Sequence, residues 1–290
     1  MSDLISELSG HPAHVSATRQ GVVSFRASAT PFDLSATTHV LLHGIGSGSG
    51  SWIKQLKSAS SNKKIIAWDA PGYGQSSHLK TNSPTAIDYA DRLWSWLDSL
   101  HLQQPVTLVG HSLGAIIATK AALLKPAQVS QLILLSPALG YGACTVQDKS
   151  AVQHQRLSTL RELGPQGMAQ KRSAALLSNH APSYLQAYVA HIMSQITVAG
   201  YEQAVHLLVN SDLLADIKQL VQPPLPLKVT VACGDLDTIT PPSKCQHAAN
   251  AAHTHLLSLG ASGHACALEA FDAVDALLNA PDHEPNTCHG

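Results

Sequence analysis

Short apolar runs recur along the chain, and longer stretches with a helical spacing of apolar residues separate them. Six of these runs are predicted to be strands, because they are short, rich in Leu, Ile and Val, and free of charge in their interiors. They are residues 39–42, 64–68, 106–109, 131–135, 228–233 and 255–259. Unbroken apolar runs are typical of strands covered on both faces, as in a parallel sheet.

Between these runs, apolar residues recur at intervals of three and four, which is typical of one buried face of a helix. One such stripe consists of Ile87, Ala90, Trp94, Leu97 and Leu100. Ser83 and Pro84 are predicted to start this helix as its N-cap and first residue. Further helices are predicted over residues 113–125, from Thr240-Pro241 to about 252, and over 267–278. Alternating strands and helices predict an α/β fold with a mostly parallel sheet.

Residues 140–222 interrupt this alternation, because they contain no run that is typical of a strand. Four helices are expected there, over residues 151–163, 168–177, 183–196 and 201–216. We interpret the segment as a helical cap inserted into the sheet domain. The core then comprises residues 1–139 and 223–280, and the polar residues 281–290 form a flexible tail.

Composition narrows the class of protein. The 290 residues carry a formal net charge of −1, and 44% of them are hydrophobic. A balanced charge argues against nucleic acid as a partner, and the apolar content argues against disorder. The five cysteines (Cys144, Cys233, Cys245, Cys266 and Cys288) include no C-x-x-C pair, so free thiols in a reducing compartment are expected.

The first residues do not resemble a secretion signal, because no basic residue precedes Arg19. The longest uncharged run, residues 99–119, contains His, Gln and Pro and is not expected to span a membrane. We therefore expect a cytoplasmic protein without membrane contact, either a monomer or a homodimer.

The clearest chemical motif is Gly110-His111-Ser112-Leu113-Gly114, which lies between a predicted strand and a predicted helix. This is the context in which G-x-S-x-G forms a nucleophile elbow: the serine occupies a strained turn, and small flanking residues leave room for it. The adjoining helix N-terminus favours developing negative charge. Ser112 is therefore the predicted nucleophile, and His111 is expected to point away from the Ser112 side chain and to support the turn.

A serine nucleophile needs a base and an acid that orients the base, and in this arrangement the chain order is Ser, Asp or Glu, then His. Asp237 follows the predicted strand 228–233, and His264 follows the strand 255–259. We predict Asp237 as the acid and His264 as the base. Asp235 is the fallback for the acid, although a turn or capping role suits it better. The end of the preceding strand is another place where such an acid could lie, but residues 136–138 there contain no carboxylate.

The glycine-rich turn after the strand 39–42 can direct a backbone N–H toward the reacting oxygen. We predict Ile45 and Leu113 as the two donors of an oxyanion hole, with Gly44 or Gly46 as alternates for Ile45. Removing one such donor generally costs about 10²–10³ in rate.

These motifs resemble those of the α/β-hydrolase superfamily, in its lidded esterase, lactonase and C–C hydrolase branch. The matching pieces are His43-Gly44, residues 69–76, 110–114 and 234–241, and Gly263-His264. The resemblance implies an eight-stranded sheet, a helical cap at 140–222 between the sixth and seventh strands, and the triad Ser112, Asp237 and His264. It also implies that residues 69–76 form a structural turn near the pocket.

Within that branch, the resemblance implies cleavage of an ester or lactone in a small to medium acyl substrate, through an acyl-enzyme and without cofactor or metal. The C–C hydrolases tend to have Asn before the nucleophile and an aromatic residue after the catalytic His, where this chain has His111 and Ala265. C–C cleavage of a vinylogous diketone is therefore the alternative, and a non-catalytic hydrolase-like binding protein ranks lower. The basic cap residues Arg156, Arg161, Lys171 and Arg172 could bind a substrate carboxylate, but a solvated helix face is the simpler interpretation.

Two other classes of site fit less well. Residues 44–50 are rich in glycine and Asp69 ends the next strand, as in a dinucleotide-binding motif, but Ser49 and Ser51 stand where G-x-G-x-x-G needs glycine. His253 and His255 form an H-x-H pair, but no third metal ligand is evident and exposure is the better interpretation.

Overall fold

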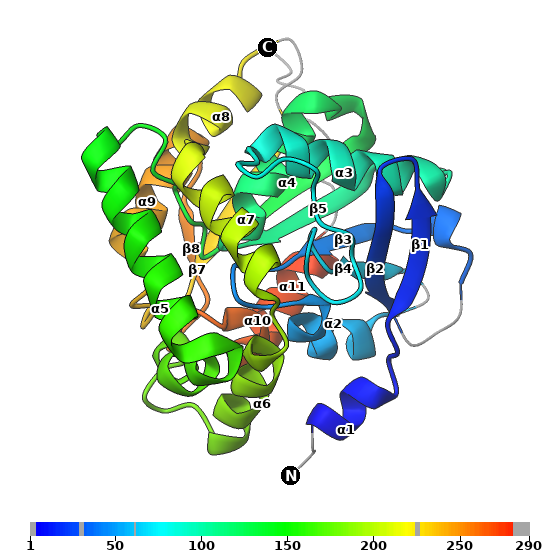
Figure 1. The fold of residues 1–290 in the computed structure, drawn as a ribbon. Helices are drawn as coiled ribbons and strands as arrows, with labels where there is room; N and C mark the ends of the chain where they lie inside the picture. Colours follow the sequence, from blue (N-terminus) through cyan, green and yellow to red (C-terminus); the bar gives the residue numbers. More distant parts are fainter. Residues whose placement is uncertain (1–3, 29–31, 61, 224–226, 281–290) are drawn as a thin grey trace.

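The computed structural model describes residues 4–28, 32–60, 62–223 and 227–280, and these residues form an eight-stranded sheet (Figure 1). The strand order is β1-β2-β4-β3-β5-β6-β7-β8. The strands are β1 (His14–Thr18), β2 (Gly21–Ala27), β3 (His39–Leu42), β4 (Ile65–Trp68), β5 (Val106–His111), β6 (Val129–Leu135), β7 (Val229–Cys233) and β8 (Leu256–Ser258). From β4 to β8 the pairing is parallel, as the apolar runs predicted.

Strands β1 and β2 are antiparallel, and the hydrophobic pattern did not indicate them. The edge strand β1 is mostly exposed, so it needs no apolar run. Strand β2 buries Ser24 between Val23 and Phe25, and this polar residue interrupts the apolar signal. These two strands complete the eight that the family resemblance implied.

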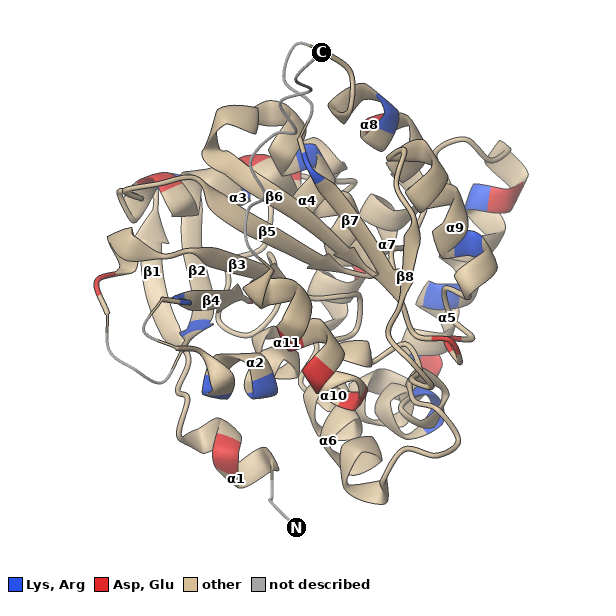
Figure 2. Cartoon of the chain, turned by 180° about the vertical axis from the view of Figure 1, so that it is seen from behind, with Lys and Arg blue, Asp and Glu red and all other residues tan. Residues whose placement is uncertain are grey.

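Helices cover both faces of the sheet (Figures 1 and 2). One face packs against α3 (Ala86–Ser99), α4 (Leu113–Leu124) and α9 (Pro242–Ala251). The other packs against α2 (Ile53–Ser58), α10 (Cys266–Glu269) and α11 (Phe271–Asn279). Alternate side chains of one strand enter the two cores: Leu42 lies in the first and Leu41 in the second.

Helix α3 starts later than predicted. Thr85 is its N-cap, and the Thr85 and Asp88 side chains form a reciprocal capping box, so the Ser83-Pro84 start was wrong. Ile87, assigned above to the apolar stripe, is 50% exposed, because the buried face is rotated toward Tyr89 and Leu93.

The segment between β6 and β7 carries α5 (Val146–Arg172), α6 (Ser183–Ser194), α7 (Val198–Asn210) and α8 (Leu213–Leu220). Helix α5 bends at Gly164, where φ is +64°, so the two predicted helices there are two arms of one element. The predicted helix 201–216 is divided, because Asp212 caps a new helix by accepting from the Ala215 N–H. The predicted helix 267–278 is likewise divided into α10 and α11.

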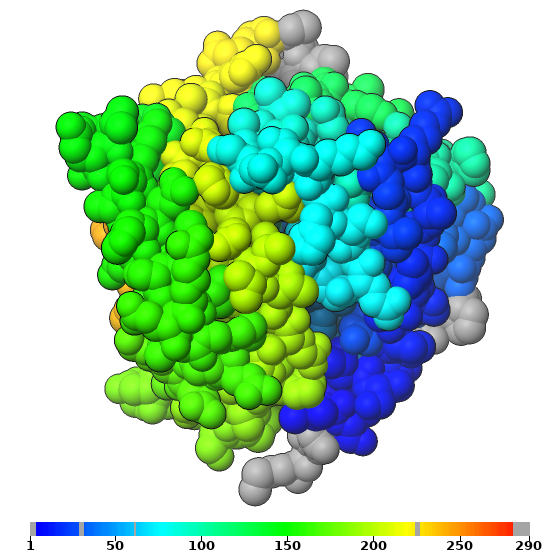
Figure 3. Space-filling model, in the orientation of Figure 1, coloured from blue at the N-terminus to red at the C-terminus, as the bar shows by residue number. Residues whose placement is uncertain are grey.

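This insertion lies against the segment that follows β4. In Figure 3 the yellow-green helices pack beside the cyan residues after β4. The Thr197 hydroxyl donates to the Gly72 carbonyl at 2.8 Å. The Gln203 amide donates to the Leu79 carbonyl at 2.9 Å and accepts from the Leu79 N–H at 3.1 Å. These polar contacts fix the insertion over the carboxyl ends of the strands.

Several predictions concern the chain as a whole. The domain boundaries at 139/140 and 222/223 stay predictions, and the tail 281–290 lies outside the described residues, as does Cys288. The other cysteines, all described, are free thiols. Within the described ranges, no helix has both the length and the apolar character needed to cross a bilayer.

Candidate active site

Ser112 lies on the turn between β5 and α4, in a backbone conformation that is rare for a side chain other than glycine. Its φ is +52° and its ψ is −115°. Both flanking glycines are required by close packing: a Cβ on Gly110 would lie 2.5 Å from the Ala115 Cα, and one on Gly114 would lie 2.2 Å from the Leu42 carbonyl oxygen. The turn therefore has the strained strand–turn–helix geometry that the motif predicted.

The loop after β3 passes close to this turn. A Cβ on Gly44 would lie 2.9 Å from the Ser112 Cβ, so the approach depends on glycine. In the described part of the chain, the N–H groups of Gly44, Ile45 and Leu113 donate to no protein atom, whereas the Gly46 N–H faces the Tyr73 hydroxyl at 3.4 Å. Ile45 and Leu113 both line the cavity beside Ser112. Of the two alternates to Ile45, Gly44 therefore has an N–H group that is free of hydrogen bonds to the described residues, whereas the Gly46 N–H is already directed at the Tyr73 hydroxyl.

Asp237 and His264 follow β7 and β8, and the structure brings them together. His264 Nδ1–H donates to Asp237 Oδ2 at 2.8 Å, and both side chains are buried. The other carboxylate oxygen, Oδ1, accepts from the backbone N–H groups of Ile239 at 2.8 Å and Thr240 at 2.9 Å. Because Nδ1 carries the proton, His264 Nε2 is left as an acceptor.

Hydrogen bonds keep Asp237 ionised. Burial pushes the pKa of Asp237 upward, but the hydrogen bond and charge of His264 and the Thr240 N–H outweigh it and lower the pKa to about 2. Asp235, the fallback acid, is exposed and accepts from the Ser258 hydroxyl at 2.7 Å. Its position fits the turn role.

Thr240 is a residue that sequence reasoning missed. Its hydroxyl lies 3.0 Å from Asp237 Oδ2, 3.2 Å from His264 Nδ1 and 3.0 Å from the Ser136 carbonyl. The sequence predicts that Thr240 and Pro241 start a helix, but α9 begins at Pro242 with Pro241 as its N-cap. The signal was available, since an Asp side chain commonly accepts hydrogen bonds from groups two and three residues further along the chain.

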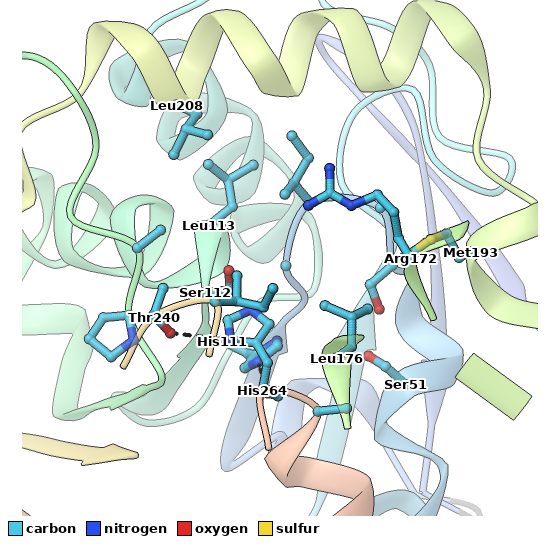
Figure 4. Close-up of a pocket in the computed structure, with 18 of the residues that line it drawn as sticks. Ser51, His111, Ser112, Leu113, Arg172, Leu176, Met193, Leu208, Thr240 and His264 are labelled. Carbon is cyan, nitrogen blue, oxygen red and sulfur yellow. Dashed lines mark hydrogen bonds between the residues drawn. The ribbon is translucent and has the colours of Figure 1, made fainter. Parts of the chain in front are cut away.

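Ser112 and His264 share one cavity, as Figure 4 shows. Among the described residues, no hydrogen bond joins the Ser112 hydroxyl to His264. Such contacts are often long before a substrate is bound. The cavity has a volume of about 420 Å³ and extends from the strand ends to residues of α5, α6 and α7.

His111 packs against the His264 ring and hydrogen-bonds to the His264 backbone. Its Nε2–H donates to the His264 carbonyl at 2.7 Å, and the two ring centroids are 4.7 Å apart. Burial, reinforced by the neighbouring His264, lowers the pKa of His111 to about 3, so the ring is neutral at pH 7. The structural role predicted for His111 agrees with these contacts.

A His111→Asn variant is expected to flatten the acid side of the stability profile. The unfolded His111 has a pKa of about 6.5 and the folded one about 3, so below pH 6.5 the unfolded state binds more protons and the free energy of unfolding falls. The slope from this one group reaches about 1.4 kcal/mol per pH unit. Urea unfolding at pH 7.5, 6 and 5 should show the variant losing less stability on acidification. Parallel profiles for the two proteins would contradict the assignment.

The Asp69 side chain stabilises the loop of residues 44–50 by accepting hydrogen bonds. Its Oδ1 accepts from the Ser49 N–H at 2.7 Å and its Oδ2 accepts from the Ser24 hydroxyl at 2.6 Å. The carboxylate is buried and both of its oxygens already accept hydrogen bonds from the protein, so it is not free to bind a ribose. This disfavours a dinucleotide site and agrees with a structural turn at 69–76. In the described residues, no group of three His, Cys, Asp or Glu side chains is arranged to hold a metal.

Comparisons with known proteins agree with this geometry. The sequence profile of the alpha/beta hydrolase fold matches residues 40–270. A protein of Pantoea ananatis named "Putative carbamate hydrolase RutD" is 27% identical over 253 residues, which are 84% of this chain and 87% of that one. The Caenorhabditis elegans abhydrolase domain-containing protein abhd-5.2 is 37% identical over 101 residues, 34% of this chain and 22% of that protein.

Among solved structures, the enol-lactonase of Burkholderia xenovorans LB400 superposes with a TM-score of 0.78 at 16% identity, over 91% of this chain and 98% of that one. At this identity the likeness concerns the fold. Since the family profile covers most of the chain and the sheet, elbow and helical insertion follow in the order expected of it, the chain belongs to the alpha/beta hydrolase fold family.

Proposed function

We propose that this protein is a serine hydrolase that cleaves an ester or lactone bond of a small to medium acyl substrate. One observation carries the proposal: the strained Ser112, His264 and the unpaired N–H groups of Ile45 and Leu113 meet at one cavity, and the buried Asp237 holds His264 at 2.8 Å. These groups fill the roles of nucleophile, base, orienting acid and oxyanion hole.

In the first half-reaction, Ser112 Oγ attacks the carbonyl carbon and its proton passes to His264 Nε2. The carbonyl π-electrons move to the oxygen, which accepts from the Ile45 and Leu113 N–H groups. Asp237 holds Nδ1–H and stabilises the imidazolium that forms. As the tetrahedral intermediate collapses, the leaving alkoxide takes the proton from Nε2, and an acyl-serine remains.

In the second half-reaction, water gives a proton to His264 Nε2 and adds to the acyl carbon. Collapse breaks the bond to Ser112 Oγ, which recovers the proton from His264, and releases the acid. The sum is one water consumed for one ester or lactone bond cleaved. For a lactone the leaving oxygen stays attached to the acyl chain, so one hydroxy acid is released.

Ester or lactone cleavage is favoured over C–C cleavage at the same site. Ala265, which follows the base, lines the cavity where C–C hydrolases tend to place an aromatic ring, and His111 occupies the position of their Asn. Two similar proteins, one named as a putative carbamate hydrolase and the other as an enol-lactonase, support this preference, because carbamates and lactones both carry a heteroatom on the carbonyl carbon.

Burst kinetics test the proposal. Stopped-flow mixing of the protein with 4-nitrophenyl butyrate is expected to release about one equivalent of nitrophenolate before the steady state, because the acyl-enzyme accumulates. A fluorophosphonate should stop turnover, and peptide mass spectrometry should find its adduct on Ser112. An adduct on another residue, or a folded protein that turns over no member of a panel of esters, lactones and vinylogous diketones, would contradict the proposal.

A further inference from the structure

The cavity that holds Ser112 has an unbalanced charge. Two arginines of the insertion, Arg156 and Arg172, line it, and Lys244 lies exposed among its lining residues. Among the described residues, no Asp or Glu side chain lines this cavity. Both arginines are partly buried, so their charge is less screened than that of a surface residue.

The structure separates the four basic cap residues into two pairs. Arg161 is exposed and forms an ion pair with Glu202 at 3.0 Å, and Lys171 is exposed and does not line the cavity. The side chains of Arg156 and Arg172 take part in no ion pair or hydrogen bond with the described residues. The solvated-face interpretation therefore fits Arg161 and Lys171, while the other two arginines face the cavity.

Arg156 and Arg172 reach the cavity from the two arms of α5, on either side of the bend at Gly164. Figure 4 shows the Arg172 side chain extending into the cavity from the side opposite Thr240. Arg156 lies within electrostatic range of the buried Tyr73, where it opposes the rise that burial causes in the pKa of Tyr73. The bend thus directs two cations into the space in front of Ser112.

A guanidinium that lacks a protein partner has five N–H donors to offer, in a planar fork that matches carboxylate or phosphate oxygens. We propose that the substrate carries an anionic oxygen group, carboxylate or phosphate, and that Arg172 and Arg156 bind it in the cavity of Ser112. This inference rests on the proposed function and names its substrate class. Arg172 also lies in the last turn of α5, where a cation stabilises the helix, and the test must separate that role from anion binding.

The test compares two substrates of similar size, mono-4-nitrophenyl glutarate and the neutral 4-nitrophenyl valerate. The readout is the ratio of their kcat/KM values. The double variant Arg156→Gln/Arg172→Gln is expected to lower this ratio about 10- to 100-fold, the loss typical of charge-assisted hydrogen bonds. An Arg172→Lys variant should recover part of the ratio, since it keeps the charge and loses the fork.

The matched control is Arg161→Gln/Lys171→Gln, which removes the same charge from the same helix outside the cavity. It should leave the ratio unchanged. Equal ratios in wild type and the cavity variant, or equal loss in the control, would overturn the proposal. A cavity variant that only lowers the melting temperature and keeps the wild-type ratio would overturn it as well. Competitive inhibition by glutarate and by propylphosphonate identifies which anion is preferred.

A binding measurement keeps this inference distinct from the proposed function. If folded wild type hydrolyses no ester, the proposed function fails, and thermal stabilisation by glutarate and propylphosphonate then becomes the readout. Stabilisation that the cavity variant loses and the control retains would sustain the anion site. No stabilisation of wild type by either anion would overturn it.

Discussion

Replacing Ser112 with alanine is expected to lower kcat for ester hydrolysis by about 10⁴-fold or more, because the variant lacks the atom that forms the acyl-enzyme in the proposed mechanism. Stability should change little. The Ser112 hydroxyl makes no hydrogen bond within the described residues, and alanine keeps the Cβ that the turn already accommodates. The measurement is steady-state hydrolysis of 4-nitrophenyl butyrate, paired with a thermal melt of each protein.

Two outcomes of this experiment are informative against the assignment. Wild-type turnover in Ser112→Ala would show that another group attacks the substrate. A large drop in melting temperature would mean that the hydroxyl supports the fold, and loss of activity could then no longer be attributed to the nucleophile. A small residual turnover without a burst phase is expected, because the proposed oxyanion donors remain and can still polarise the carbonyl.

The parts of the site that sequence reasoning found are those tied to local rules. G-x-S-x-G needs glycines because the packing around Ser112 leaves no room for a Cβ at the flanking positions. This constraint can therefore be recognised in the amino-acid sequence itself. Asp237 and His264 follow apolar runs, and the ends of parallel strands meet at one edge of the sheet. Their 2.8 Å contact could therefore be anticipated from two strand ends.

The parts that were missed depend on tertiary contacts. Thr240 has the same local signature whether it caps a helix or holds Asp237, and only the position of His264 distinguishes these roles. The four basic cap residues look alike in sequence. Their division into a cavity pair and a solvated pair follows from the bend of α5 at Gly164 and from its packing on α6 and α7.

Asp237→Asn is expected to lower kcat about 10³- to 10⁴-fold with little loss of substrate binding. Oδ1 of Asp237 accepts from the N–H groups of Ile239 and Thr240, so the oxygen of an asparagine amide should occupy that position. Its NH₂ group then faces His264 Nδ1, which must become an acceptor. The imidazole proton moves to Nε2, and His264 loses the acceptor that the proposed mechanism needs for the proton of Ser112.

Asp235→Asn is the matched control, because it makes the same chemical change two residues away, on an exposed side chain whose partner is Ser258. It should keep kcat within about twofold, as surface changes usually do. If Asp235→Asn lost as much activity as Asp237→Asn, the acid would be misassigned or the loop as a whole would be responsible. Loss confined to Asp237→Asn, with an unchanged melting temperature, would locate the effect in the tautomer of His264, since the two variants differ in whether the new amide faces that ring.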